Sequence, residues 1–202
     1  MKSSKGSAFE REICKKLSLW WSNNQSDDIF WRTAGSGARA TTRRKSGKDT
    51  FGQAGDVQAT DPVGQPLIDL CNIEIKRGYS KAHLAELLDA PDHLKPCLYA
   101  QFIEQAVNDA EAAGSPYWWL IVKRDRRVPI IIIPRQFISK LKLRSPLTKV
   151  EGCYFAVKYT AKTNRIYTVR KIVGCPLDNF LEHVSSVYVR NKYHRLIQKS
   201  KK

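Results

Sequence analysis

The chain has 202 residues, 42% of them hydrophobic and 27% charged, which is enough for one domain with a sizeable core. Lys and Arg number 35 against 19 Asp and Glu, so the net charge of +16 predicts a polyanionic partner, nucleic acid first. The sequence contains neither an apolar run long enough to span a bilayer nor a useful basic amphipathic helix, which argues against a membrane partner.

The cysteines and the first residues bear on the cellular compartment. The stretch from Met1 to Gly6 is polar and charged, unlike a signal peptide. Five cysteines, an odd number, contain no CxxC pair, and the four histidines are scattered. We therefore predict reduced thiols, no zinc site and a cytoplasmic location.

Residues 7–21 are predicted to form an amphipathic helix, and Glu10 in its first turns has two interpretations. Ser7 and Glu10 match a capping box, which the local sequence alone favours. The alternative makes Glu10 a third carboxylate of a metal site. The residues at helical spacing on the apolar face are Phe9, Ile13, Leu17 and Trp20.

The next segment combines a short predicted strand, 28–32, with two loops suited to phosphate. The loop 32–37 carries an arginine, glycines and Ser36, whose guanidinium, backbone N–H and hydroxyl groups can wrap a phosphate. A cationic loop follows, without any acidic residue from 39 to 48, and we expect it to grip a nucleic-acid backbone. Its basic residues are Arg39, Arg43, Arg44, Lys45 and Lys48.

The stretches Gly55–Val57 and Ile73–Lys76 are predicted strands, joined as a hairpin through a short turn at 61–66. Alternation places Glu74 and Lys76 on one face, and the hairpin would bring Asp56 beside them. Two carboxylates and an amine at one spot can hold Mg²⁺ and orient a water for phosphodiester hydrolysis. The alternative without a catalytic role is that Glu74 and Lys76 form a weak ion pair on a solvated strand face.

The rest of the chain predicts a mixed α/β layer followed by a C-terminal region of different texture. A helix over 98–113 is bounded by Gly114 and Pro116, which end helices. The other predicted elements are a helix at 80–89, strands at 117–123 and 128–133, a helix at 136–143, strands at 152–159 and 165–173, and a helix at 176–187 before a basic tail. We divide the chain into a core, residues 1–144, and an extension, residues 145–202.

Four stretches, taken as an ordered set, resemble the archaeal-type Holliday-junction resolvases of the PD-(D/E)XK nuclease superfamily. They are Lys5–Glu12, Arg32–Ser36, Gly55–Val57 and Ile73–Lys76, and the resemblance covers about residues 5–142. It implies a nuclease-like α/β core with a mixed central sheet flanked by helices, to which the C-terminal hairpin and helix would be an extension.

The resemblance also implies a site and a substrate. Matching positions make Glu10, Asp56, Glu74 and Lys76 catalytic, with the three carboxylates at Mg²⁺, for which Mn²⁺ would substitute. Arg11, Arg32 and Ser36 would contact the scissile phosphate. The family implies a homodimer that cuts branched DNA.

Three departures from the family pattern favour the nuclease class over the junction substrate. The segment between Ser36 and Asp56 is longer than in the compact family, as is the stretch after Lys76, and the region after Ser145 has no counterpart. The alternatives are another PD-(D/E)XK nuclease, restriction-like or for DNA repair, and a non-catalytic DNA-binding protein.

Overall fold

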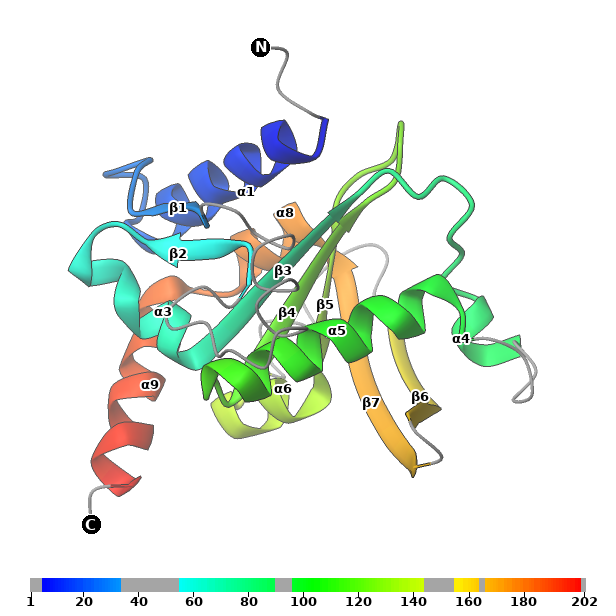
Figure 1. Cartoon of the computed structure of the whole chain (residues 1–202). Coiled ribbons are helices and arrows are strands. Elements are labelled where there is room, and N and C mark those ends of the chain that lie inside the picture. Colours follow the sequence, from blue (N-terminus) through cyan, green and yellow to red (C-terminus); the bar gives the residue numbers. More distant parts are fainter. Residues whose placement is uncertain (1–4, 34–54, 90–95, 144–154, 164–165, 201–202) are drawn as a thin grey trace, which may run out of the picture.

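A five-stranded mixed sheet forms the centre of the computed structural model, which describes residues 5–33, 55–89, 96–143, 155–163 and 166–200 (Figure 1). The strands lie in the order β3-β4-β5-β7-β6, and only β3 and β4 are parallel. Their bounds are β3 Cys71–Arg77, β4 Tyr117–Lys123, β5 Ile130–Pro134, β6 Phe155–Thr163 and β7 Ile166–Pro176. The predicted mixed α/β fold is confirmed.

Helices cover both faces of the sheet, and a two-stranded sheet of β1 and β2 lies beside it. The strands β1 and β2 span Phe30–Arg32 and Val57–Ala59. The helices are α1 Lys5–Trp21, η1 Pro62–Gly64, α3 Gln65–Leu70, α4 Glu86–Asp89, α5 Leu98–Ala113, α6 Arg135–Leu141, α8 Leu177–His183 and α9 Ser186–Ser200. Within the described ranges, none of these helices has the length and apolar character needed to cross a membrane.

Alternation along the strands builds one hydrophobic core on each face of the sheet. On β4, Trp119 and Ile121 pack into the core that also holds residues of α1, α6 and α8. Trp118, Leu120 and Val122, which point the other way, pack against α5. Both faces of β4 are therefore buried, as expected for a central strand covered by helices.

Helix α1 forms as its apolar spacing predicts, but it begins two residues before Ser7. Phe9, Ile13 and Leu17 are fully buried, whereas Trp20 is partly buried and its neighbour Trp21 takes the inner position. Because Ser7 lies inside the helix rather than at its N-cap, the capping-box interpretation of Glu10 loses its basis.

Helix α5 has the predicted bounds, and its end shows why. Gly114 adopts φ +70° at the C-cap, and its N–H reaches the carbonyls of Ala110 and Glu111. Glycine takes this left-handed conformation without steric penalty. Helix α5 is the crossover that makes β3 and β4 parallel.

The predicted hairpin between residues 55–57 and 73–76 is wrong. Strand β2 pairs antiparallel with β1, and the segment expected as a turn contains η1 and α3. The helix expected over 80–89 is also shorter, since only α4 forms there and the side chain of Leu88 is 71% exposed.

The C-terminal hairpin, expected as an extension, completes the same sheet. Strand β7 pairs with β5 from Ile130↔Pro176 to Pro134↔Ile172, and β6 pairs with β7 at the edge. The single helix expected over 176–187 is two helices, α8 and α9, and Phe180 and Val189 join the core of α1.

Candidate active site

The site is built on β3, whose two faces have opposite roles. Ile73 and Ile75 pack in the core beneath α1. Glu74 and Lys76 lie on the face toward α5, and Glu74 is only 4% exposed. The alternation predicted for this strand is confirmed, and it delivers a buried carboxylate beside a lysine.

Asp56 reaches Glu74 without a hairpin. Gly55 turns the chain with φ +76°, and the N–H of Asp56 donates to the carbonyl of Ile73 at 2.8 Å. The N–H of Ile75 donates in turn to Oδ2 of Asp56, also at 2.8 Å. These bonds hold the Asp56 carboxylate against the backbone on both sides of Glu74. The carbonyl of Asp56 accepts the N–H of Thr33 at 3.0 Å, which attaches the end of β1 to the same point.

The three charged groups influence one another. Burial raises the pKa of Glu74 to about 7, and the nearby Asp56 carboxylate adds to the rise while Lys76 opposes it. Burial alone would lower the pKa of Lys76, but the Glu74 carboxylate outweighs it and leaves that pKa above its ordinary value. The site therefore holds two carboxylates whose joint ionisation is costly, together with an ammonium group that reduces the cost.

Two donors orient the Glu74 carboxylate. Nζ of Lys76 and Nε2 of Gln105 both donate to Oε1, at 2.5 and 2.9 Å. Both of these hydrogen bonds are accepted by Oε1 of Glu74. Gln105 lies on α5. Its contact with Glu74 spans 31 residues of sequence, and no local pattern in the sequence indicates it.

Glu10 forms an ion pair with Arg32. Its Oε2 accepts Nε of Arg32 at 2.8 Å, which links α1 to β1. Burial raises the pKa of Cys14, with further contributions from Glu10 and Asp56, so both carboxylates lie within electrostatic reach of this thiol. Even so, no group of three or more His, Cys, Asp or Glu residues in the described chain is arranged to hold a metal ion. The expected three-carboxylate cluster is thus not assembled, and Asp56 and Glu74 form a pair.

With this geometry in place, comparison with known proteins identifies the family. Residues 1–191 match the model of the family described as "Phage putative PDDEXK endonuclease". The chain belongs to this PDDEXK endonuclease family. No curated protein and no solved structure matched the chain. The match supports the PD-(D/E)XK superfamily implied by the ordered motifs, but it does not single out archaeal-type Holliday-junction resolvases.

The family match runs past residue 145 and so includes β6, β7 and α8 of this PDDEXK endonuclease. These elements belong to the length that the family shares.

In this PDDEXK endonuclease Arg11 lies on α1 and Arg32 on β1, and both are partly buried. Their neighbour in both cases is Glu10, by sequence for Arg11 and by the ion pair for Arg32. The remaining predicted DNA-binding residues lie outside the described residues. They are Ser36, Arg39, Arg43, Arg44, Lys45 and Lys48.

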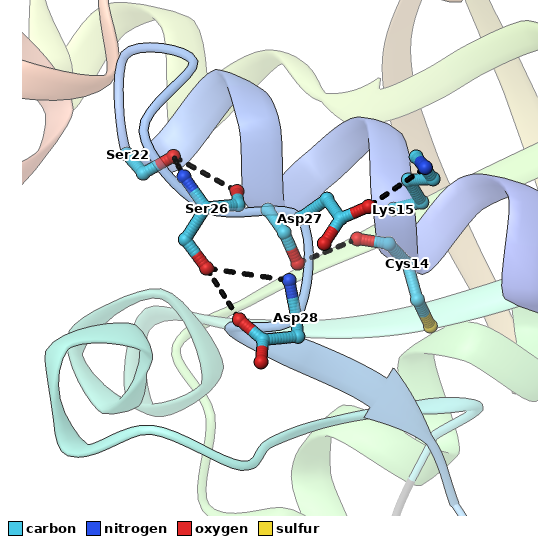
Figure 2. Close-up of polar contacts among 7 residues, drawn as sticks. Cys14, Lys15, Ser22, Ser26, Asp27 and Asp28 are labelled. Atoms are coloured by element: carbon cyan, nitrogen blue, oxygen red, sulfur yellow. Dashed lines mark hydrogen bonds and ion pairs between the residues drawn. The ribbon is translucent and has the colours of Figure 1, made fainter.

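The loop between α1 and β1 fixes the strand that carries Arg32 (Figure 2). Oγ of Ser22 accepts the N–H groups of Gln25 and Ser26, at 3.1 and 2.9 Å, and Lys15 forms an ion pair with Asp27 at 2.7 Å. The Ser26 hydroxyl donates to the Asp28 carboxylate. These contacts stabilise the turn that connects α1 to β1.

The donor set of this PDDEXK endonuclease fits a hard divalent cation. Asp56 and Glu74 offer carboxylate oxygens, which Mg²⁺ and Mn²⁺ prefer. Burial and the Asp56 carboxylate raise the pKa of Glu74, and a bound divalent cation would favour the ionised form of both carboxylates. One or two carboxylates with water are the usual protein contribution to a Mg²⁺ site.

Proposed function

We propose that this protein is a divalent-metal-dependent DNA endonuclease that cuts branched DNA, in the first place four-way junctions. The observation that carries the proposal is the buried Asp56–Glu74 pair with Lys76 at 2.5 Å from Glu74. Membership of a PDDEXK endonuclease family supports the nuclease class. The ordered resemblance to junction resolvases supports the branched substrate.

In this proposal Asp56 and Glu74 hold Mg²⁺, with Mn²⁺ as a substitute. The bound ion would lower the pKa of a water and polarise the phosphodiester. Lys76 orients the attacking water, because its ammonium group is held at Oε1 of the Glu74 carboxylate. Glu10 takes part through water, and through Arg32, whose guanidinium with that of Arg11 stabilises charge developing on the phosphate.

The partner and the assembly follow from the same resemblance. A net charge of +16 supports DNA as the polyanion, and two cuts across a junction require two sites, hence a homodimer. The described cysteines, Cys14, Cys71, Cys97 and Cys175, are free thiols, which supports a reducing cytoplasm.

A cleavage assay on a four-way junction and on a matched linear duplex tests the proposal. We expect the wild type with Mg²⁺ to cut the junction at enzyme concentrations that leave the duplex intact. Asp56→Asn and Glu74→Gln should each lower cleavage by at least a hundredfold while retaining DNA binding in Ca²⁺. Glu182→Gln, at an exposed position on α8, is the matched control and should cut normally.

Each alternative predicts another result. Equal cutting of junction and duplex would replace the resolvase by a different PD-(D/E)XK nuclease. Binding without any cleavage in Mg²⁺ or Mn²⁺ would point to a non-catalytic DNA-binding protein. Cleavage that survives Asp56→Asn would remove the proposed metal site.

A further inference from the structure

Tyr79 is an exposed aromatic residue held in an unusual backbone conformation directly after the site. It follows Lys76 by three residues, its side chain is 46% exposed and its φ is +50°. A bulky residue in the left-handed region carries strain, which the surrounding structure must offset. Gly78, with φ +97°, makes the preceding bend.

Backbone hydrogen bonds fix this bend. The N–H of Gly78 donates to the carbonyl of Lys123 at 3.0 Å, which ties the bend to the end of β4. The carbonyl of Tyr79 accepts the N–H of Ala82 at 2.9 Å. Figure 1 shows the chain leaving β3 beside the tip of the β4–β5 hairpin before it runs to α4. The backbone that carries Tyr79 is therefore fixed by hydrogen bonds on both sides of this residue.

The Tyr79 ring lies next to the same aromatic residue as Lys76. Its centroid is 4.8 Å from that of Phe102, with the planes at 64°, and Nζ of Lys76 lies 5.7 Å from the Phe102 centroid. Phe102 itself is 6% exposed. The buried Phe102 thus forms a base on which the proposed water-orienting lysine and the exposed tyrosine both sit.

The charge around Tyr79 suits a nucleic-acid backbone. Residues 76–81 contain Lys76, Arg77 and Lys81 and no acidic residue. The neighbouring β4–β5 turn adds Arg124, Arg126 and Arg127 against the single acid Asp125. An aromatic ring set among cations is the usual combination for binding unpaired nucleic acid, in which the cations contact phosphates and the ring stacks on a base.

We propose that Tyr79 is a stacking platform for an unpaired base next to the phosphate that is cut. The inference rests on the proposed nuclease site and narrows its substrate to DNA with an unpaired nucleotide there. In a matched duplex the bases are already stacked and paired, so engaging Tyr79 would cost a few kcal/mol of unstacking. A nucleotide in a gap or a single-stranded flap of branched DNA is already unpaired and does not bear that cost.

Fluorescent DNA measures the stacking directly. The probe is 2-aminopurine at the unpaired position of a gapped DNA, titrated in Ca²⁺ with the full chain, and the comparison is a matched duplex with the same probe. We expect quenching of the unpaired probe by wild type and by Tyr79→Phe. Tyr79→Ala should lose the quenching and bind the gapped DNA about tenfold more weakly, with less than a twofold change for duplex.

Two controls keep the test decisive. Val187→Ala, on α9, truncates a side chain of similar exposure, 52%, and should change the binding of neither the gapped DNA nor the duplex. Thermal melting of each variant checks folding, and Tyr79→Leu supplies a second variant that keeps apolar bulk without a stacking face. Equal losses on gapped and duplex DNA, or unchanged quenching in Tyr79→Ala, would overturn the proposal. Because binding is read without cleavage, a failure of the nuclease proposal is seen separately in Mg²⁺.

Discussion

At the scale of single residues, the environment of Glu74 makes a signed prediction about its pKa, which burial and Asp56 raise to about 7. Asp56→Asn removes the like charge yet keeps an oxygen for the N–H of Ile75, so the pKa of Glu74 should fall toward its ordinary value. Gln105→Met removes a donor to the ionised carboxylate and should raise the pKa. A ¹³C-NMR titration of the metal-free protein measures both shifts.

The matched control for this titration is Gln101→Met, one turn earlier on α5. Nε2 of Gln101 donates to the carbonyl of Pro96 rather than to the site. Its replacement should leave the Glu74 titration unchanged. A rise of the Glu74 pKa in Asp56→Asn would contradict the placement of the two carboxylates as neighbours.

Individual site residues differ in how far the sequence could predict them. Glu74 and Lys76 were placed on one face because strand alternation is local and strict. Gln105 was missed, and the ion pair of Glu10 with Arg32 was not foreseen, because both contacts join separate elements. Sequence spacing says which face of a helix is apolar, but it does not say which strand the polar face meets.

At the scale of elements, the bend before β2 depends on one glycine. A Cβ on Gly55 would overlap the Asn72 side-chain oxygen and lie 2.9 Å from the carbonyl oxygen of Ile73, in addition to the strain of φ +76°. We expect Gly55→Ala to lower the free energy of unfolding by about 2–4 kcal/mol, measured by urea denaturation.

Gly114→Ala separates backbone strain from crowding. This glycine has a similar φ of +70°, but a Cβ there meets no atom within 4 Å. Its substitution should cost only about 1–2 kcal/mol, the ordinary penalty of a left-handed residue. Equal losses in the two variants would show that the packing of Gly55 against β3 adds nothing.

Elements with local boundary signals were predicted well, and those decided by distant partners were not. Helix α5 carries its own stop in Gly114 and Pro116. Residues 61–66 were predicted as a turn, yet α3 begins at Gln65 with Pro66 in its first turn, where the missing N–H of proline has no intrahelical acceptor. Strand β2 pairs with β1 and not with β3 as predicted. This pairing depends on residues far apart in the chain, which a short sequence pattern does not specify.

At the scale of the whole molecule, the C-terminal hairpin is part of the central sheet. Strands β6 and β7 widen the sheet beyond β5, and Arg170 on β7 forms a two-pronged ion pair with Glu104 on α5, at 2.8 and 2.9 Å. The C-terminal region therefore supports the helix that carries Gln105. The family match also extends through it, to residue 191.

The excess charge of the whole chain predicts how its DNA affinity responds to salt. A net charge of +16 implies that binding is driven largely by neutralised phosphates and released counterions. Between 50 and 200 mM salt we expect the affinity for a four-way junction in Ca²⁺ to fall by at least a hundredfold, as for a protein that contacts several phosphates. Fluorescence anisotropy across this range gives the slope of log Kd against log salt.

The same titration separates charge from stacking. Arg126→Ala, in the exposed β4–β5 turn, should weaken binding to all DNA equally and reduce the slope by about one. Tyr79→Ala should leave the slope unchanged, because stacking on a base releases no counterion. A salt-independent affinity would mean that the positive charge serves another purpose, and the backbone-gripping role of the basic residues would then have to be abandoned.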